Sequence, residues 1–239
     1  MTELVAPAYP PPADPPVPLA GIARLADFEP LALQRLHPAA RAYYAGGAGD
    51  EHTVRDNLAS FGRYRLRPRV LVDVEHVDLR TTLLGREVSM PVGIAPAALH
   101  GLAHADGECA TARAAAAAGV LQTVSTVASR TIEQIADSAP GAPRWFQLYV
   151  QRERSVTREL VERAEAAGYE ALALTVDLPV LGYRDDVLRL EFDPGREAYA
   201  NLPKRAVWDA GIDEVLDLRS VGLTWDSLAE IRGWSGLPL

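Results

Sequence analysis

Residues 144–177, RWFQLYVQRERSVTRELVERAEAAGYEALALTVD, decide the fold of this chain. The segment begins and ends with short runs rich in apolar and β-branched residues, 144–150 and 171–177, and each run predicts a strand. The residues between them, 155–167, predict a helix that ends at Gly168. Its apolar side chains recur along one face, at Val156, Leu160, Val161, Ala164 and Ala167. A strand, a helix and a second strand in this order predict a parallel βαβ unit.

The same alternation continues upstream. Residues 92–95 and 120–124 predict two more strands, and residues 106–118 and 131–138 predict two more helices. The second of these helices begins with the Thr-x-x-Gln spacing of a capping box. Four strands alternating with helices predict an α/β fold with a parallel sheet, either doubly wound or a barrel, and periodicity does not choose between them.

The flanking segments differ in composition from this repeat. Seven of the first eighteen residues are proline, a density that excludes helix and removes donors from a sheet, so residues 1–19 are predicted to be a disordered extension. Residues 20–239 are predicted to form one domain. It begins with helices over 20–61, broken at Gly46-Gly47, and continues with a hairpin over 77–91 that turns at Gly85.

A long stretch without periodicity follows the fourth predicted strand. Residues 179–223 far exceed the usual connection of about 2–6 residues, which predicts an active-site loop or a lid. Residues 225–234 predict a final helix, and residues 237–239 resemble the start of a fifth strand.

The charge and composition of the chain exclude several kinds of partner. The formal charge is −8, whereas a nucleic acid or an anionic membrane surface requires a basic face, so we expect a small-molecule partner, no nucleic acid and no membrane. No run approaches the roughly 20 apolar residues of a membrane helix, and the first residues lack the order of a signal peptide, which favours a cytoplasmic location. The single cysteine, Cys109, excludes an intrachain disulfide and predicts a small packing residue.

The predicted strands end in neutral polar or small residues. In a barrel the reactive groups lie at the carboxyl ends of the strands. The residues there are the turn Ala95-Pro96-Ala97-Ala98, then Ser125, then Gln147 with Tyr149, and finally Thr175 with Asp177. Several neutral hydrogen-bonding groups suit a planar heterocycle. The strand ends alone equally allow that polar residues simply gather where strands leave the core, and that Asp177 is a structural cap.

Six motifs in order add a resemblance to this pattern. They are Tyr43–Asp50 (YYAGGAGD), Arg67-Pro68-Arg69, Ile94-Ala95-Pro96, His104–Glu108 (HADGE), Trp145–Tyr149 (WFQLY) and Thr175-Val176-Asp177. From about Ala20 to Leu239 the chain resembles the FMN-dependent 2-hydroxy-acid oxidase and dehydrogenase family, which includes glycolate oxidase, lactate oxidase, mandelate dehydrogenase and flavocytochrome b2. The resemblance implies an incomplete TIM (β/α)8 barrel, with about the first four βα units preceded by N-terminal helices and a small hairpin.

The resemblance also implies site residues. The residues that correspond to FMN contacts of the family are Pro96, Ala97, Ala98, Ser125, Gln147 and Thr175. The residues that correspond to substrate contacts are Tyr43, Tyr149 and Arg184. A guanidinium at Arg184 can hold a carboxylate through two hydrogen bonds. Arg184 beside Asp185 and Asp186 also fits a solvated loop arginine, and the resemblance favours the carboxylate clamp.

Two other patterns suggest sites that we do not favour. Gly46, Gly47 and Gly49 follow a predicted helix rather than a strand, which favours a helix-ending turn over a phosphate loop. His100 and His104 have helical spacing, but no third ligand is evident, so no metal site is predicted.

The resemblance implies that the complete protein oxidises a small (S)-2-hydroxy acid to the 2-oxo acid by reducing FMN. Val127 stands where several glycolate-type relatives carry a large aromatic residue, which favours a lactate-like substrate over glycolate. The family's catalytic histidine lies in a Ser-Asn-His-Gly stretch that we expect beyond Leu239, and none of the five histidines of this sequence corresponds to it. No catalytic residue is therefore assigned within the chain.

We accordingly expect the chain alone to be inactive, and to be unstable or oligomeric because four parallel strands leave exposed edges. The complete protein is expected to be a homo-oligomer. The alternative is a truncated or split, catalytically inactive half-barrel that acts only as a structural or interaction partner, for example of a separately encoded C-terminal half.

Overall fold

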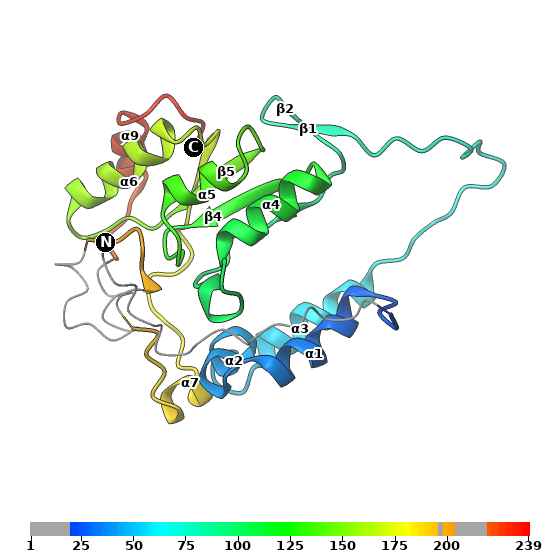
Figure 1. The fold of residues 1–239 in the computed structure, drawn as a ribbon, viewed down its shortest axis with the longest axis horizontal. Helices are drawn as coiled ribbons and strands as arrows, with labels where there is room; N and C mark the ends of the chain where they lie inside the picture. The colour runs from blue at the N-terminus through cyan, green and yellow to red at the C-terminus, as the bar shows by residue number, and fades with distance from the viewer. Residues whose placement is uncertain (1–19, 196–197, 204–218) are drawn as a thin grey trace.

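The computed structural model describes residues 20–195, 198–203 and 219–239 (Figure 1). The predicted disordered extension over residues 1–19 lies outside the described residues. Part of the stretch 179–223, predicted to be an irregular loop, also lies outside them.

Four parallel strands form the centre of the fold. They are β3 (Gly93–Ile94), β4 (Leu121–Ser125), β5 (Arg144–Leu148) and β6 (Ala171–Leu174), and they lie in sequence order within the sheet. The predicted α/β fold with a parallel sheet is confirmed. Strand β5 ends two residues earlier than predicted because the backbone N–H of Tyr149 donates to Thr126 Oγ1 at 3.0 Å instead of to a neighbouring strand.

Three helices connect these strands and pack along the sheet. They are α4 (Glu108–Ala118), α5 (Ile132–Ser138) and α6 (Arg154–Ala166). Helix α4 packs on β4 and α5, and α6 packs on β5 and α5. The predicted capping box is confirmed, since Thr131 Oγ1 accepts from the N–H of Gln134 at 3.1 Å while Gln134 Oε1 accepts from the N–H of Thr131 at 3.1 Å.

The two faces of the sheet have different surroundings. On the helix-covered face, Val124, Phe146 and Leu172 lie at matching register positions and are at most 5% exposed. On the opposite face, here called the open face, the alternate residues Thr123, Trp145 and Ala173 are partly exposed. Because side chains alternate along a strand, this second face also carries Ser125 and Gln147.

The helices before the sheet form a separate layer next to a later segment. They are α1 (Phe28–Arg35), α2 (Pro38–Ala45) and α3 (His52–Ser60), with the 3-10 turns η1 (Leu25–Asp27) and η2 (Phe61–Arg63). Helix α2 packs on α7 (Asp185–Arg189), which follows β6 (Figure 1). Helix α7 falls within the stretch predicted to be irregular, so that prediction was wrong there. The sequence did not predict this helix because five residues are too few to show helical periodicity. Within the helix, Arg189 pairs with Asp185 and Asp186.

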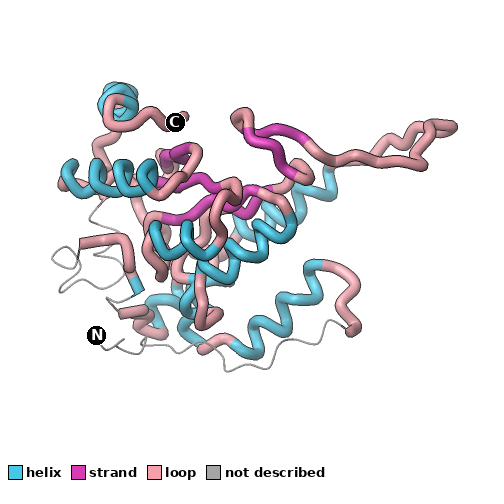
Figure 2. The backbone as a smooth tube through the Cα atoms, turned by 45° about the horizontal axis from the view of Figure 1, so that its top comes forward, coloured by secondary structure: helices cyan, strands magenta, loops and turns pink. Residues whose placement is uncertain are grey.

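The predicted hairpin is confirmed, and an exposed arm leads into it. Strands β1 (Thr81–Leu83) and β2 (Arg86–Val88) are antiparallel, and Leu84 and Gly85 turn between them. Residues 64–80, here called the arm, leave the body of the molecule and return to it (Figures 1 and 2). Its side chains are exposed, with Leu66 at 99% and Leu71 at 104%.

The last described segment packs beside α6 and β6. Helix α9 (Trp225–Arg232) is the predicted final helix, two residues shorter than expected. No strand is assigned over 237–239 in the described part of the chain, although the N–H of Leu172 in β6 donates to the carbonyl of Pro238 at 2.8 Å. None of the described helices has the length and apolar character that crossing a bilayer requires.

Candidate functional site

A pocket of about 380 Å³ lies where the open face meets the carboxyl ends of β4, β5 and β6. It is lined by eight of the nine residues that the sequence predicts for the site: Tyr43, Pro96, Ala98, Ser125, Gln147, Tyr149, Thr175 and Arg184. The ninth, Ala97, is exposed and does not line it. Val127, Leu178 and Leu181 also line the pocket and supply apolar surface.

The polar floor of the pocket is a chain of hydrogen bonds across three strands. Gln147 Oε1 accepts from Ser125 Oγ at 3.3 Å and from the N–H of Thr126 at 3.1 Å. Gln147 Nε2 donates to Thr175 Oγ1 at 2.8 Å. The chain forms because Ser125 and Gln147 are opposite each other in the register of β4 and β5, on the same face. Gln147 is thereby held in one orientation.

This floor retains donors for a ligand. A primary amide carries two hydrogens, so Gln147 has a second one beyond its bond to Thr175, and the Thr175 hydroxyl still has its own proton to donate. Pro96 and Ala98 line the pocket with small side chains. Neutral donors beside a small-residue wall fit a flat heterocycle with carbonyl and ring-nitrogen edges, of the kind a flavin presents.

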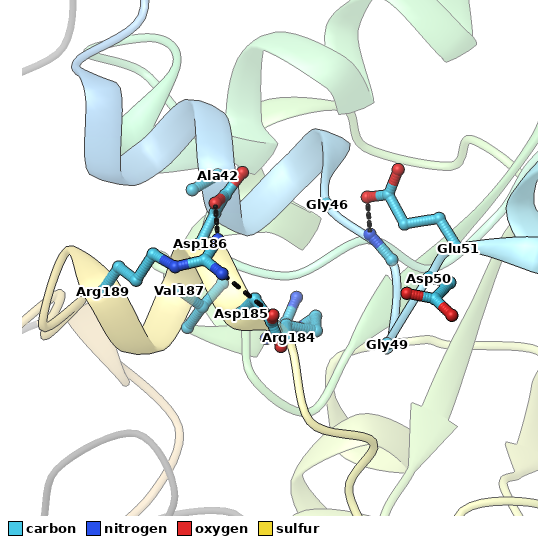
Figure 3. A pocket seen from close by; sticks show the side chains of 11 residues that line it. Ala42, Gly46, Gly49, Asp50, Glu51, Arg184, Asp185, Asp186, Val187 and Arg189 are labelled. Carbon is cyan, nitrogen blue, oxygen red and sulfur yellow. Dashed lines mark hydrogen bonds and ion pairs between the residues drawn. The ribbon is translucent and has the colours of Figure 1, made fainter.

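Arg184 and Tyr43 form the opposite side of the pocket. The Arg184 guanidinium carbon lies 4.8 Å from the centre of the Tyr43 ring, and its NH1 donates to the Tyr43 carbonyl at 2.9 Å. One of the five guanidinium hydrogens is used in this bond. The neighbouring Asp185 and Asp186 pair with Arg189 rather than with Arg184 (Figure 3). Arg184 is therefore placed against Tyr43 at the pocket instead of pairing within its own loop.

Tyr149 is braced by a residue that the sequence analysis missed. The guanidinium carbon of Arg219 lies 5.2 Å from the centre of the Tyr149 ring, and Arg219 NH1 donates to the Leu178 carbonyl at 2.9 Å. Seventy residues separate Arg219 from Tyr149, and no local pattern marks this arginine.

Both pocket tyrosines keep their protons at neutral pH. Burial raises the pKa of the Tyr43 hydroxyl, although Arg184 acts in the opposite direction. Burial likewise raises the pKa of Tyr149, opposed by Arg219. Both phenols are therefore neutral hydrogen-bond donors beside the cationic Arg184.

The glycine-rich turn next to the site ends a helix, as predicted. Gly46 is the C-cap of α2 and its N–H donates to the Ala42 carbonyl at 3.0 Å. The N–H of Gly47 donates to Glu51 Oε1 at 2.8 Å, so a carboxylate of the chain itself occupies this donor (Figure 3). A phosphate would have to compete with that carboxylate. These residues border a separate pocket of about 230 Å³ together with α7.

The histidines lie away from the pocket. His100 Nδ1 is 3.0 Å from Thr111 Oγ1, and His104 Nδ1 accepts from the N–H of Asp106 at 3.0 Å. None of the five histidines, all of which are described, lines the pocket. The described residues contain no group of three or more His, Cys, Asp or Glu side chains that could hold a metal ion.

Comparison with known sequences gives a consistent set of relatives. Glycolate oxidase 1 of Zea mays is 47% identical over 171 residues, which are 72% of this chain and 46% of that protein. An L-lactate oxidase of Nostoc sp. is 43% identical over 228 residues, which are 90% of this chain and 62% of that protein. The chain thus spans about half the length of the curated relatives it matches.

Solved structures with the same fold agree with these relatives. The recombinant flavin-binding domain of baker's yeast flavocytochrome b2 matches with a TM-score of 0.79 and 37% identity, over 92% of this chain and 53% of that one. A mandelate oxidase with (S)-mandelic acid matches with a TM-score of 0.79 and 34% identity, over 90% of this chain and 59% of that one. The family model of the FMN-dependent dehydrogenases matches residues 32–239. The chain therefore belongs to the FMN-dependent dehydrogenase family.

Proposed function

We propose that the complete protein oxidises a small (S)-2-hydroxy acid, with lactate favoured, to the 2-oxo acid, and that this chain supplies the flavin-ring contacts and part of the substrate contacts. The observation that carries the proposal is the convergence of eight predicted site residues on one pocket. We further propose that the sheet is the first half of a (β/α)8 barrel, whose interior is the open face. The sequential order of four parallel strands supports this arrangement.

The floor and one wall of the pocket suit FMN, which would serve as a two-electron acceptor when bound. Gln147 and Thr175 would donate to the polar edge of the ring, and Ser125 would hold Gln147 in place. Pro96 and Ala98 line the pocket and Ala97 lies between them in the chain; this turn, here called the ring wall, has only small side chains, so its backbone could lie close to a planar group. No charged group is needed for these contacts, which fits a neutral ring.

The opposite side suits the carboxylate and hydroxyl of the substrate. Arg184 would bind the carboxylate through two hydrogen bonds, and the neutral phenols of Tyr43 and Tyr149 would donate to substrate oxygens. The apolar surface of Val127, Leu178 and Leu181 leaves room for a short alkyl group. These contacts favour a lactate-like acid over glycolate, which has no alkyl group to bury.

Proton removal from the substrate would require a base from elsewhere. Because none of the described histidines lines the pocket, we expect residues 1–239 alone to turn over no 2-hydroxy acid. We expect activity only from the protein expressed from its whole gene. Turnover of lactate by the purified chain of residues 1–239 would contradict this expectation.

The flavin contact can be tested with two matched threonine variants of the protein expressed from its whole gene. Thr175 lines the pocket and bonds Gln147, whereas Thr123 lies on the same face without lining the pocket. FMN titration, followed by flavin fluorescence, should give Thr123→Val the wild-type affinity and Thr175→Val an affinity about tenfold weaker, the value of one lost hydrogen bond of roughly 1.4 kcal/mol. Equal affinities would place the flavin elsewhere.

The substrate preference can be tested on the same protein without oxygen. L-lactate should bleach the flavin absorbance faster than glycolate does, because of the apolar pocket surface. If glycolate reduces the flavin faster, the lactate-like assignment is wrong while the flavin contacts are unaffected.

A further inference from the structure

Glu108 is a buried acid outside the pocket that the proposed reaction does not use. It is the first residue of α4, is 1% exposed, and is the last residue of the His104–Glu108 motif. Its Oε1 accepts from the N–H of His100 at 3.0 Å and from the N–H of Ser129 at 3.0 Å. Its Oε2 accepts from Ser129 Oγ at 2.7 Å. Three donors thus converge on one carboxylate.

These donors belong to two loops that adjoin the pocket, one carrying the ring wall and the other following Ser125, the last residue of β4. His100 follows the ring wall in the loop between β3 and α4, and Ser129 follows Ser125 in the loop between β4 and α5. Ser129 Oγ also accepts from the N–H of Gly101 at 2.7 Å. Through Glu108 and Ser129, the backbones of the two loops are joined by side-chain hydrogen bonds.

The two loops pack closely where Ser129 lies against Gly101 and Gly107. A Cβ atom on Gly101 would lie 2.8 Å from Ser129 Oγ, and one on Gly107 would lie 3.0 Å from it. Leu99, between the ring wall and His100, has a φ of 60°, a left-handed conformation that a leucine rarely adopts. Its N–H donates to the Val127 carbonyl at 3.1 Å. This bond ties the uncommon backbone conformation at Leu99 to the loop that contains Val127.

Burying a carboxylate costs more free energy than burying an apolar side chain of similar size. The burial of the Glu108 carboxylate is tolerated here because backbone and hydroxyl donors satisfy it and because it lies at the N-terminus of α4, where a negative charge is favoured. The first of these conditions requires the two loops to be in this arrangement, because they supply the donors. The carboxylate and the loop geometry therefore depend on each other.

We propose that Glu108 is a positioning residue that fixes the ring wall of Pro96, Ala97 and Ala98 relative to Ser125 and Val127, and so sets the width of the slot that receives the flavin. This inference rests on the proposed function. It assigns to the HADGE motif a role in flavin binding that acts through the two loops and not through contact with the flavin.

The test compares Glu108→Ala, Glu108→Gln and Glu162→Ala in the protein expressed from its whole gene. Glutamine keeps one oxygen for the N–H groups of His100 and Ser129, whereas alanine keeps none. Glu162 is an exposed glutamate on α6 that pairs with Arg158, so Glu162→Ala serves as the control. The measurements are amide hydrogen exchange, residue by residue, without FMN, and the Kd for FMN.

In Glu108→Ala, the amides of His100, Gly101 and Ser129 should exchange at least tenfold faster while those of β5 are unchanged, and the Kd for FMN should rise about tenfold. Glu108→Gln should restore most of both losses, and Glu162→Ala should match the wild type. If Glu108→Ala does not fold, the comparison of Glu108→Gln with the wild type carries the test, with smaller shifts of the same kind expected.

Three outcomes would overturn the proposal: unchanged exchange in both loops, faster exchange throughout the sheet, or faster loop exchange with an unchanged Kd. The second would mean that Glu108 serves stability in general, and the third that the loops do not set the flavin slot. Failure of the wild type to bind FMN would be a different result. It would overturn the proposed function and the positioning role that rests on it. The exchange data would still show whether Glu108 holds the two loops.

Discussion

The helix-covered face and the open face of the sheet are built from the same strands, one residue apart. On the helix-covered face Phe146 is fully buried among apolar side chains, and on the open face its neighbour Gln147 joins a polar chain that lines a pocket. Since side chains alternate along a strand, a single strand serves the core with one set of residues and the site with the other. Substitutions on the two faces should therefore affect different measurements.

The largest difference is expected at Phe146. Phe146→Ala removes a fully buried ring that packs edge to face on Tyr169, with 5.9 Å between ring centres. The free energy of unfolding, measured by urea denaturation, should fall by about 3–5 kcal/mol. A fall below about 1 kcal/mol would show that the helix-covered face is not the main core.

A smaller loss of stability with a specific loss of binding is expected at Gln147. Gln147→Leu leaves the Ser125 hydroxyl and the Thr126 N–H without their acceptor, which should cost about 1–3 kcal/mol in the same measurement. The Kd for FMN should rise by tenfold or more under conditions where the variant is fully folded. An unchanged Kd would contradict the assignment of FMN binding to the open face.

The smallest effect is expected from two tyrosines at alkaline pH. Burial raises the pKa values of Tyr169, against the helix-covered face, and of Tyr149, at the pocket, above their usual value of 10.0. Each contribution to stability is thus fully present below pH 10 and is lost as pH rises toward the pKa of the folded state. The loss per tyrosine one pH unit above 10 is at most about 1.4 kcal/mol.

Urea denaturation between pH 8 and about pH 11 checks this expectation with two phenylalanine variants. Tyr169→Phe should flatten the alkaline decline more than Tyr149→Phe, because Tyr169 is 2% exposed whereas Tyr149 is only partly buried. A decline that neither variant changes would mean that other groups control alkaline stability.

The repeating part of the fold could be predicted from the sequence, because alternation in residues 144–177 is a local property. The convergence of Ser125, Gln147 and Thr175 could also be predicted, since parallel strands end at the same edge of the sheet. The resemblance, not periodicity, located Tyr43 and Arg184. What remained was set by tertiary contacts: Thr126 ends β5 by taking the N–H of Tyr149, and Arg219 reaches Tyr149 from a distant segment. Glu108 was visible only as part of a motif, because its donors lie in two loops.

The exposed arm of residues 64–80 is the only covalent link between the helices that carry Tyr43 and the strands and loops that carry most of the pocket. It offers Arg65 and Arg69 to trypsin in an exposed, extended backbone, the kind of segment in which proteases cut first. A cut there would leave α1 to α3, with Tyr43, joined to the sheet only by noncovalent contacts such as the bond from Arg184 to the Tyr43 carbonyl. The nicked protein would then be a two-fragment complex, with one side of its pocket on a separable peptide.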